Sequence, residues 1–264
     1  MKPTLRMSAM ALGLAVGLPS LVYAQPVTTL PKIGLLAWDS CNEPELIAGL
    51  KELGRIPGEN LLIECRSAGA RYEGFPKAAA ELARLPVDVI VAASQPAGRA
   101  AREATATIPI VMIASGDPVS SGLAQSLSAP GGNVTGVTYY ATELTGKRLA
   151  LLKEMVPTAS TIGVLANPAT ADLPFEKDTR QAAKALGLTL ITRQVSEPGD
   201  LDEAFRQMKA QGAQAVFVLP SMTFSDRAKQ IADLALTQRV PLMASGSWFT
   251  GAGGVMAYSA DYAT

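Results

Sequence analysis

Ten apolar runs of strand length, separated by amphipathic segments, constrain the fold of this chain more than any other feature of its sequence. The runs are apolar throughout rather than alternating, which is typical of strands covered on both faces. Amphipathic helices separate them; for example, Leu46, Leu50 and Leu53 recur at helical spacing just before Gly54. This alternation predicts a parallel, doubly wound α/β architecture. The runs are KIGLLAW, NLLIEC, VDVIVAAS, IPIVMIAS, NVTGVTYY, TIGVLAN, LTLITRQV, AVFVLP, VPLMAS and GVMAYS.

The whole pattern occurs twice. KIGLLAWDS is echoed by TIGVLANPA, and the SGD that follows one run is echoed by the SGS that follows another. The offset is 129 positions between Ile33 and Ile162 and 130 positions between Ser115 and Ser245. A nearly constant offset indicates a duplicated unit rather than a chance likeness between apolar strands. We therefore predict two α/β lobes, residues 25–140 and 141–264, joined by a hinge.

Composition argues against several classes of function. The chain contains no histidine, which removes the commonest general base and the commonest metal ligand. Lys plus Arg and Asp plus Glu are equal at 23 each, which argues against nucleic acid or an anionic membrane as the partner. The stretch GDPVSSG lacks the lysine of a phosphate-binding loop, and no GxSxG nucleophile motif is present. We expect no catalytic activity, no metal and no cofactor.

The first 24 residues have the pattern of an export signal. Lys2 and Arg6 precede the short apolar run MALGLAVGLPSLV, and VYA precedes Gln25 as a small-residue cleavage site after Ala24. A membrane anchor needs about 20 apolar residues, whereas this run is shorter and is interrupted by Pro19. We expect cleavage and export to an oxidising compartment.

Cys41 and Cys65 are the two cysteines of the chain. Each follows an apolar run, so neighbouring parallel strands would bring their ends close together. Disulfide geometry requires Cα atoms within about 7 Å, which a sequence does not specify. A structural disulfide and two free thiols both remain open. A catalytic pair is not indicated, because CxxC spacing is absent.

Small polar side chains follow the predicted strands in both halves. Ligands of open α/β sheets bind outside the carboxyl ends of the strands, so these residues would line a cleft between the lobes. Helix N-termini beside them would favour an anionic group such as a carboxylate. Asp39 and Asp117 are also suited to helix capping or turns, and Trp38 to an ordinary core. The candidates are Trp38, Asp39, Ser94, Gln95, Ser115 and Asp117 in the first half and Asn167 and Ser221 in the second.

The export signal, the twin lobes and the run GDPVSSGLAQSLSAPGGNVTGV together resemble the substrate-binding proteins of bacterial ABC importers. The stretches ELARLPVDVIVA, REATATIPIVM and GGVMAYSADYA fit the same family. The resemblance implies a type I periplasmic binding fold that closes on a small solute and passes it to a membrane permease. Carried over to this chain, it implies ligand contacts at Trp38, Ser94, Gln95, Asp117, Asn167, Ser221 and Tyr258.

The chain departs from the family pattern in two places. Amino-acid binders of the family place an acid after the strand at 215–220, whereas PSMTFSD has none before Asp226, which weakens the case for an amino-acid ligand. Family members also continue past MAYSADYA with a helix and strands that return to the first lobe, so we expect a fragment or a short form.

We expect a monomeric periplasmic solute-binding protein. Two alternatives stay open: a periplasmic α/β enzyme acting on a small carboxylate through Asp39 or Asp117, and a ligand-sensing domain that reports to a membrane receptor.

Overall fold

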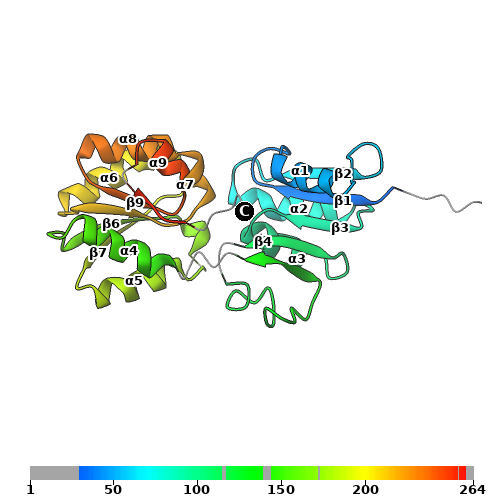
Figure 1. Cartoon of the computed structure of the whole chain (residues 1–264), viewed down its shortest axis with the longest axis horizontal. Helices are drawn as coiled ribbons and strands as arrows, with labels where there is room; N and C mark the ends of the chain where they lie inside the picture. The colour runs from blue at the N-terminus through cyan, green and yellow to red at the C-terminus, as the bar shows by residue number, and fades with distance from the viewer. Residues whose placement is uncertain (1–29, 115–116, 139–143, 172, 255, 260–264) are drawn as a thin grey trace, which may run out of the picture.

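Two parallel sheets of five strands each, lying side by side in separate lobes, form the protein (Figure 1). The computed structural model describes residues 30–114, 117–138, 144–171, 173–254 and 256–259. The expected export signal and Ser115 lie outside the described residues, as does most of the expected junction between the lobes. The two parallel-sheet α/β lobes predicted from the alternating pattern are confirmed.

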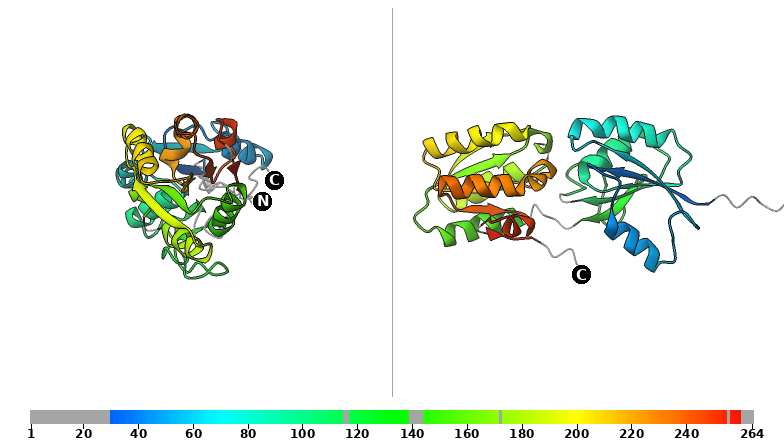
Figure 2. Two further views of the ribbon diagram at one scale, coloured as in Figure 1. Left: turned by 90° about the vertical axis from the view of Figure 1, so that its left-hand side faces the viewer. Right: turned by 90° about the horizontal axis from the view of Figure 1, so that it is seen from above.

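The first lobe contains strands at all five of the apolar runs in its half of the sequence. Its helices α2 and α3 cover one face of the sheet, and α1 lies on the opposite face (Figure 2). Its elements are β1 (Lys32–Ala37), α1 (Pro44–Glu52), β2 (Leu62–Ser67), a 3-10 turn η1 (Tyr72–Gly74), α2 (Phe75–Ala83), β3 (Val89–Ala92), α3 (Gln95–Ala104), β4 (Ile110–Ala114) and β5 (Val134–Thr138).

The second lobe repeats this plan with helices on both faces of its sheet. Helices α6 and α8 pack on one face, and α4 and α5 pack on the other. Its elements are α4 (Leu144–Met155), β6 (Thr161–Ala166), η2 (Pro168–Thr170), α5 (Phe175–Ala185), β7 (Thr189–Gln194), η3 (Pro198–Asp200), α6 (Leu201–Ala210), β8 (Ala215–Val218), α7 (Met222–Asp226), α8 (Ala228–Gln238), β9 (Leu242–Ala244), α9 (Trp248–Gly251) and β10 (Met256–Ala257).

The two sheets have the same strand order, as a duplicated unit requires. The first runs β2-β1-β3-β4-β5, and the second runs β7-β6-β8-β9-β10 when read in the same direction. The echoed strands β1 and β6 occupy equivalent positions, each paired with the second and the third strand of its lobe. Because every pairing between these strands is parallel, the residues that follow each strand lie at one edge of each sheet.

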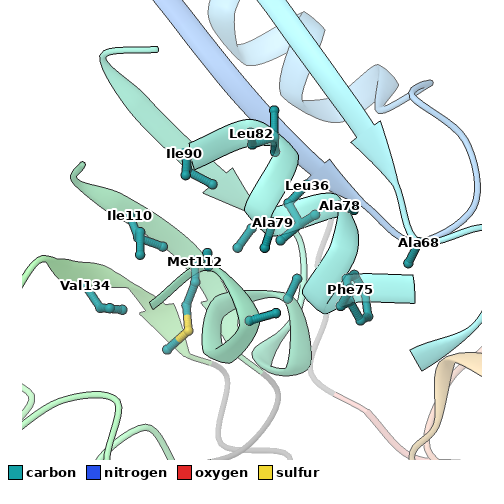
Figure 3. Close-up of a cluster of buried hydrophobic side chains, with 14 of the residues drawn as sticks. Leu36, Ala68, Phe75, Ala78, Ala79, Leu82, Ile90, Ile110, Met112 and Val134 are labelled. Atoms are coloured by element: carbon teal, nitrogen blue, oxygen red, sulfur yellow. The ribbon is translucent and has the colours of Figure 1, made fainter. Parts of the chain in front are cut away.

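Separate cores of buried side chains hold each lobe together. In the first lobe, Leu36, Ile90 and Ile110 point from the sheet toward Ala79 and Leu82 of α2 (Figure 3). Burial of such side chains contributes about 25 cal/mol per Å² of apolar surface. In the second lobe, the apolar stripe of α6 is fully buried; it consists of Leu201, Phe205 and Met208.

Part of the first sheet is uncovered on the face that carries α1. Within the described residues, Val111 and Ile113 of β4 and Val137 of β5 are exposed, with 66% of Val137 accessible. Helix α1 contains no buried residue, and Leu53 beyond its end is 79% exposed. The helix predicted from the leucine spacing is present, but the leucines of its stripe are not buried. A parallel sheet is normally covered on both faces. The α1 face of the first sheet departs from this rule, because β4 and β5 are exposed there.

A disulfide joins Cys41 to Cys65, with the two Cα atoms 6.0 Å apart. Cys65 lies inside β2 rather than just past its end, since the strand continues to Ser67. Cys41 belongs to the segment that follows β1 and carries Trp38. The bond therefore ties the segment after β1 to the neighbouring strand.

Replacing both cysteines with serine should lower the free energy of unfolding by about 3 kcal/mol, because the bond closes a loop of 24 positions. Urea denaturation of the oxidised protein and of the double variant measures this difference. Thiol titration of unreduced, denatured protein should find almost no free thiol. Two free thiols per chain would contradict the pairing.

Candidate ligand-binding cleft

A cavity of about 370 Å³ lies between the lobes, at the carboxyl edges of both sheets. This volume lies near the lower end of the range for small-molecule sites. Its walls come from segments that follow β1, β2, β3, β6, β8 and β9, together with the end of β4 and helix α4. The lining residues are Trp38, Tyr72, Ala93, Ser94, Pro96, Ile113, Arg148, Thr170, Leu173, Phe175, Pro220, Ser221, Met222, Ser225, Asp226, Ser245 and Trp248.

The first lobe contributes an aromatic wall. Trp38 directly follows β1, and Tyr72 begins the turn η1 after β2, with their ring centroids 4.9 Å apart. Phe75 supports the indole from behind at 5.9 Å. The turn depends on Gly74, because a Cβ at this position would collide with the backbone carbonyl of Ala68. A glycine therefore allows the close approach that presents Tyr72 to the cavity.

The second lobe contributes an apolar wall on the opposite side. Leu173 lies between β6 and α5, Phe175 is the first residue of α5, and Trp248 begins α9 after β9. The indole of Trp248 lies over the backbone of Gly246, where any Cβ would overlap the ring. This contact explains the glycine in the SGS stretch: it makes room for an aromatic side chain rather than for a phosphate.

Two hydrogen bonds cross from the first lobe to α7 of the second. The indole Nε1–H of Trp38 donates to the Asp226 carboxylate at 2.6 Å, and the backbone N–H of Met222 donates to the Tyr72 hydroxyl at 2.9 Å. Burial raises the pKa of Tyr72 above its ordinary value, and the neighbouring Asp226 charge adds to this effect. The phenol is therefore neutral at physiological pH, so that its oxygen accepts the Met222 bond without bringing a buried charge.

Arg148 is the one cationic side chain among the described residues that line the cavity. It lies on α4 and is 1% exposed, and its Nε–H donates to the backbone carbonyl of Tyr258 at 2.7 Å. That bond helps to orient the guanidinium. A guanidinium in a site of low dielectric attracts a carboxylate more strongly than one in water. The site can therefore hold an anionic group beside its aromatic walls.

Two features are absent from the described residues, a metal-binding cluster and a membrane-spanning helix. Within them, no group of three or more His, Cys, Asp or Glu side chains is placed to hold a metal ion. The described part of the chain likewise contains no helix long and apolar enough to cross a membrane.

Three of the residues predicted from the sequence line the cavity, namely Trp38, Ser94 and Ser221. Ser94 also caps α3, since its Oγ accepts the N–H of Ala97 at 3.3 Å. Gln95, the first residue of α3, is fully buried directly behind Ser94. Gln95 does not line the cavity, and for Trp38, Ser94 and Ser221 the role of ligand contact stays a prediction.

The other predicted residues that the structure describes do not line this cavity. Asp39 is exposed on the segment after β1, and Tyr258 supplies its backbone carbonyl to Arg148. The Asp117 carboxylate accepts the N–H of Val119 at 2.9 Å in a turn. Asn167 accepts the N–H of Ala169 at 2.9 Å and borders a smaller neighbouring cavity of about 230 Å³. Ser115 lies outside the described residues.

Sequence reasoning missed the residues that give the cavity its charge and much of its aromatic surface. Arg148 occupies a helical spacing otherwise taken by buried Leu149 and Leu152, and this break in an apolar stripe could have indicated it. Asp226 lies several residues beyond its strand, so its position in the sequence does not place it at the strand end. Helix α7 returns it to the cavity wall, so the argument against an amino-acid ligand no longer holds. Tyr72 and Trp248 had no distinguishing pattern.

Two parallel-sheet lobes with a ligand-sized cavity between their carboxyl edges define a two-lobed binding protein. The chain belongs to the ABC transporter substrate binding protein family, whose model matches residues 43–264. The family resemblance stated from the sequence is thereby confirmed.

Several individual proteins are similar to this chain. A tyrosine-binding protein of Clostridioides difficile is 27% identical over 217 residues, which cover 82% of this chain and 62% of that relative's length. A conserved domain protein from Vibrio cholerae has a TM-score of 0.79 at 25% identity, covering 89% of this chain and 80% of the other. An ABC domain from Streptococcus pneumoniae in complex with L-Trp has a TM-score of 0.76 at 23% identity, covering 88% of this chain and 80% of the other.

The position of Asp117 leads to a prediction that separates stability from binding. Asp117→Ala should lower the free energy of unfolding by about 0.5–1.5 kcal/mol through loss of the Val119 hydrogen bond, with solute affinity unchanged. Asp117→Asn keeps a hydrogen-bond acceptor, so its free energy of unfolding should fall by less. Chemical denaturation and calorimetric titration of both variants measure the two quantities. A tenfold loss of affinity with unchanged stability would instead place Asp117 in the binding site.

Proposed function

We propose that this protein is the solute-binding component of an ABC importer, exported to the periplasm, which takes a small solute between its lobes and delivers it to a membrane permease. The observation that carries the proposal is the cavity itself, which both lobes build from the ends of their strands. A site divided in this way suits a protein that captures its ligand by hinge closure. Membership of the substrate-binding family supports the same function.

The walls of the cavity favour a solute with an aromatic or apolar body and a carboxylate. Arg148 suits the carboxylate, and the rings of Trp38, Phe175 and Trp248 suit the body. Asp226 lies in the same cavity and can accept a hydrogen bond from an ammonium group. This combination fits an aromatic amino acid. The tyrosine-binding relative and the L-Trp complex support that choice of ligand class.

The proposal includes no catalytic step. Asp226 is the one carboxylate among the described residues that line the cavity, and it already accepts the Trp38 bond. General acid–base chemistry of the kind considered for Asp39 and Asp117 requires a side chain within hydrogen-bond reach of the substrate. Neither aspartate lines the cavity. Transfer of the bound solute to a permease, measured in reconstituted vesicles, distinguishes a transport component from a receptor-coupled sensor.

Arg148 provides the test of the proposed ligand class. Arg148→Gln should weaken binding of L-tyrosine or L-tryptophan by roughly 10- to 100-fold, because a charge-assisted hydrogen bond to the carboxylate is lost. Arg148→Lys retains the charge but lacks the planar guanidinium. Its affinity for the amino acid should lie between those of Arg148→Gln and the parent. Isothermal titration calorimetry measures the affinities, and thermal unfolding checks that the variants remain folded.

Lys147→Gln is the matched control, since it removes one positive charge from the same helix at an exposed position outside the cavity. It should bind like the parent. Equal losses in Lys147→Gln and Arg148→Gln would show a general charge effect and would contradict a specific carboxylate site. If the parent binds neither amino acid, native mass spectrometry of freshly purified protein should identify the solute that it carries instead.

A further inference from the structure

We propose that Trp38 and Tyr72 of the first lobe form a latch on helix α7 of the second lobe, and that this latch stabilises the closed arrangement before any ligand binds. The inference rests on the proposed function in one respect: closure is taken to be the step that captures the solute. The latch itself is defined by contacts between residues of this chain and does not depend on which solute is bound.

The two side chains contact opposite ends of the same short helix. Helix α7 runs from Met222 to Asp226 and begins at the edge of the second lobe that faces the first (Figure 1). The Tyr72 hydroxyl accepts the N–H of Met222, the first residue of the helix. The Trp38 indole N–H donates to the carboxylate of Asp226, the last residue of the helix. The Tyr72 hydroxyl also lies 3.4 Å from the Ser221 Oγ. Separation of the lobes must therefore break contacts at both ends of the helix.

The helices that follow the third strands of the two lobes are capped differently. Ser94 and Ser221 are the N-cap residues of the helices that follow the third strands, β3 and β8. Ser94 caps α3 in the usual way, through its Oγ. The Ser221 side chain makes no such bond to α7. The Ser94 bond satisfies the third N–H of α3, whereas the first N–H of α7, that of Met222, is bonded to the Tyr72 hydroxyl. A residue of the first lobe therefore takes part in capping a helix of the second.

One side of the latch is shielded from solvent. Trp38 is buried and Tyr72 is half-buried, whereas Asp226 is exposed at the end of α7. The bond to Asp226 is charge-assisted, and such bonds are about twice as strong as neutral ones. Arg71 and Glu197 also form an ion pair between the lobes at 3.0 Å, but both side chains are more than half exposed. Exposed ion pairs contribute little, so the aromatic pair is the main restraint among these contacts.

A latch of this kind changes affinity without changing the ligand's own contacts. Apparent affinity scales with the fraction of molecules that already hold the binding-competent arrangement. Residues that favour closure in the absence of ligand raise that fraction. Trp38 and Tyr72 therefore act on binding through closure, in addition to forming part of the cavity wall.

Trp38→Phe and Tyr72→Phe test the latch, because each variant keeps an aromatic ring and removes the polar group. We expect both ligand-free variants to show a larger radius of gyration than the parent by small-angle X-ray scattering. We also expect the affinity for L-tyrosine to fall by up to about tenfold in calorimetric titrations. Arg71→Gln, which removes the exposed ion pair between the lobes, is the matched control and should behave like the parent.

The second lobe supplies an independent test if a first-lobe variant does not fold. Asp226→Ala removes the acceptor of the Trp38 bond and should open the ligand-free protein, whereas Asp226→Asn keeps an acceptor and should stay compact. An unchanged radius of gyration in Trp38→Phe, Tyr72→Phe and Asp226→Ala overturns the latch, whatever their affinities. If the variants open but the parent binds no amino acid, the latch stands and the proposed ligand class fails.

Discussion

The strands of a parallel sheet deliver the residues that follow them to a single edge, and this constraint decides where the protein can bind a ligand. In the first lobe, β1 lies between β2 and β3, so the segments after these three strands emerge beside one another. They carry Trp38, Tyr72 and Ser94. The second sheet has the same order and faces the first with the same edge. The cavity is the space between two such edges, and its lining is a direct consequence of strand order.

The chemistry of the cavity comes from a few charged groups placed against apolar walls. A guanidinium beside indole and phenyl rings attracts an anion more strongly than it would in water, because less solvent screens it. The same surroundings make any unpaired charge costly. Arg148 is oriented by the Tyr258 carbonyl, and Asp226 accepts the Trp38 bond. The proposed aromatic amino acid would place its carboxylate near the guanidinium and its side chain against the apolar walls.

The sequence predicted the fold more fully than the site, for physical reasons. Strand-length apolar runs repeat with a nearly constant offset, and burial on two faces leaves that pattern whatever the ligand. Site residues lie in connecting segments, where the direction of a side chain depends on local turns. Gly74 places Tyr72, and the helix α7 returns Asp226 to the cavity. Neither effect leaves a periodic signal. Arg148 is different, because it interrupts a buried stripe on α4 and could have been recognised there.

Duplication alone would give two lobes with the same surface. The described lobes differ at the point where they meet. The first presents a phenol and an indole N–H, and the second presents a helix whose first N–H and last carboxylate match them. The serine that caps α3 in the first lobe has a counterpart at α7 that does not cap its own helix. A backbone donor that its own lobe leaves unsatisfied needs a partner, and the nearest one here belongs to the other lobe. The Met222 N–H at the start of α7 has its partner in the other lobe, so contact between the two copies satisfies this donor.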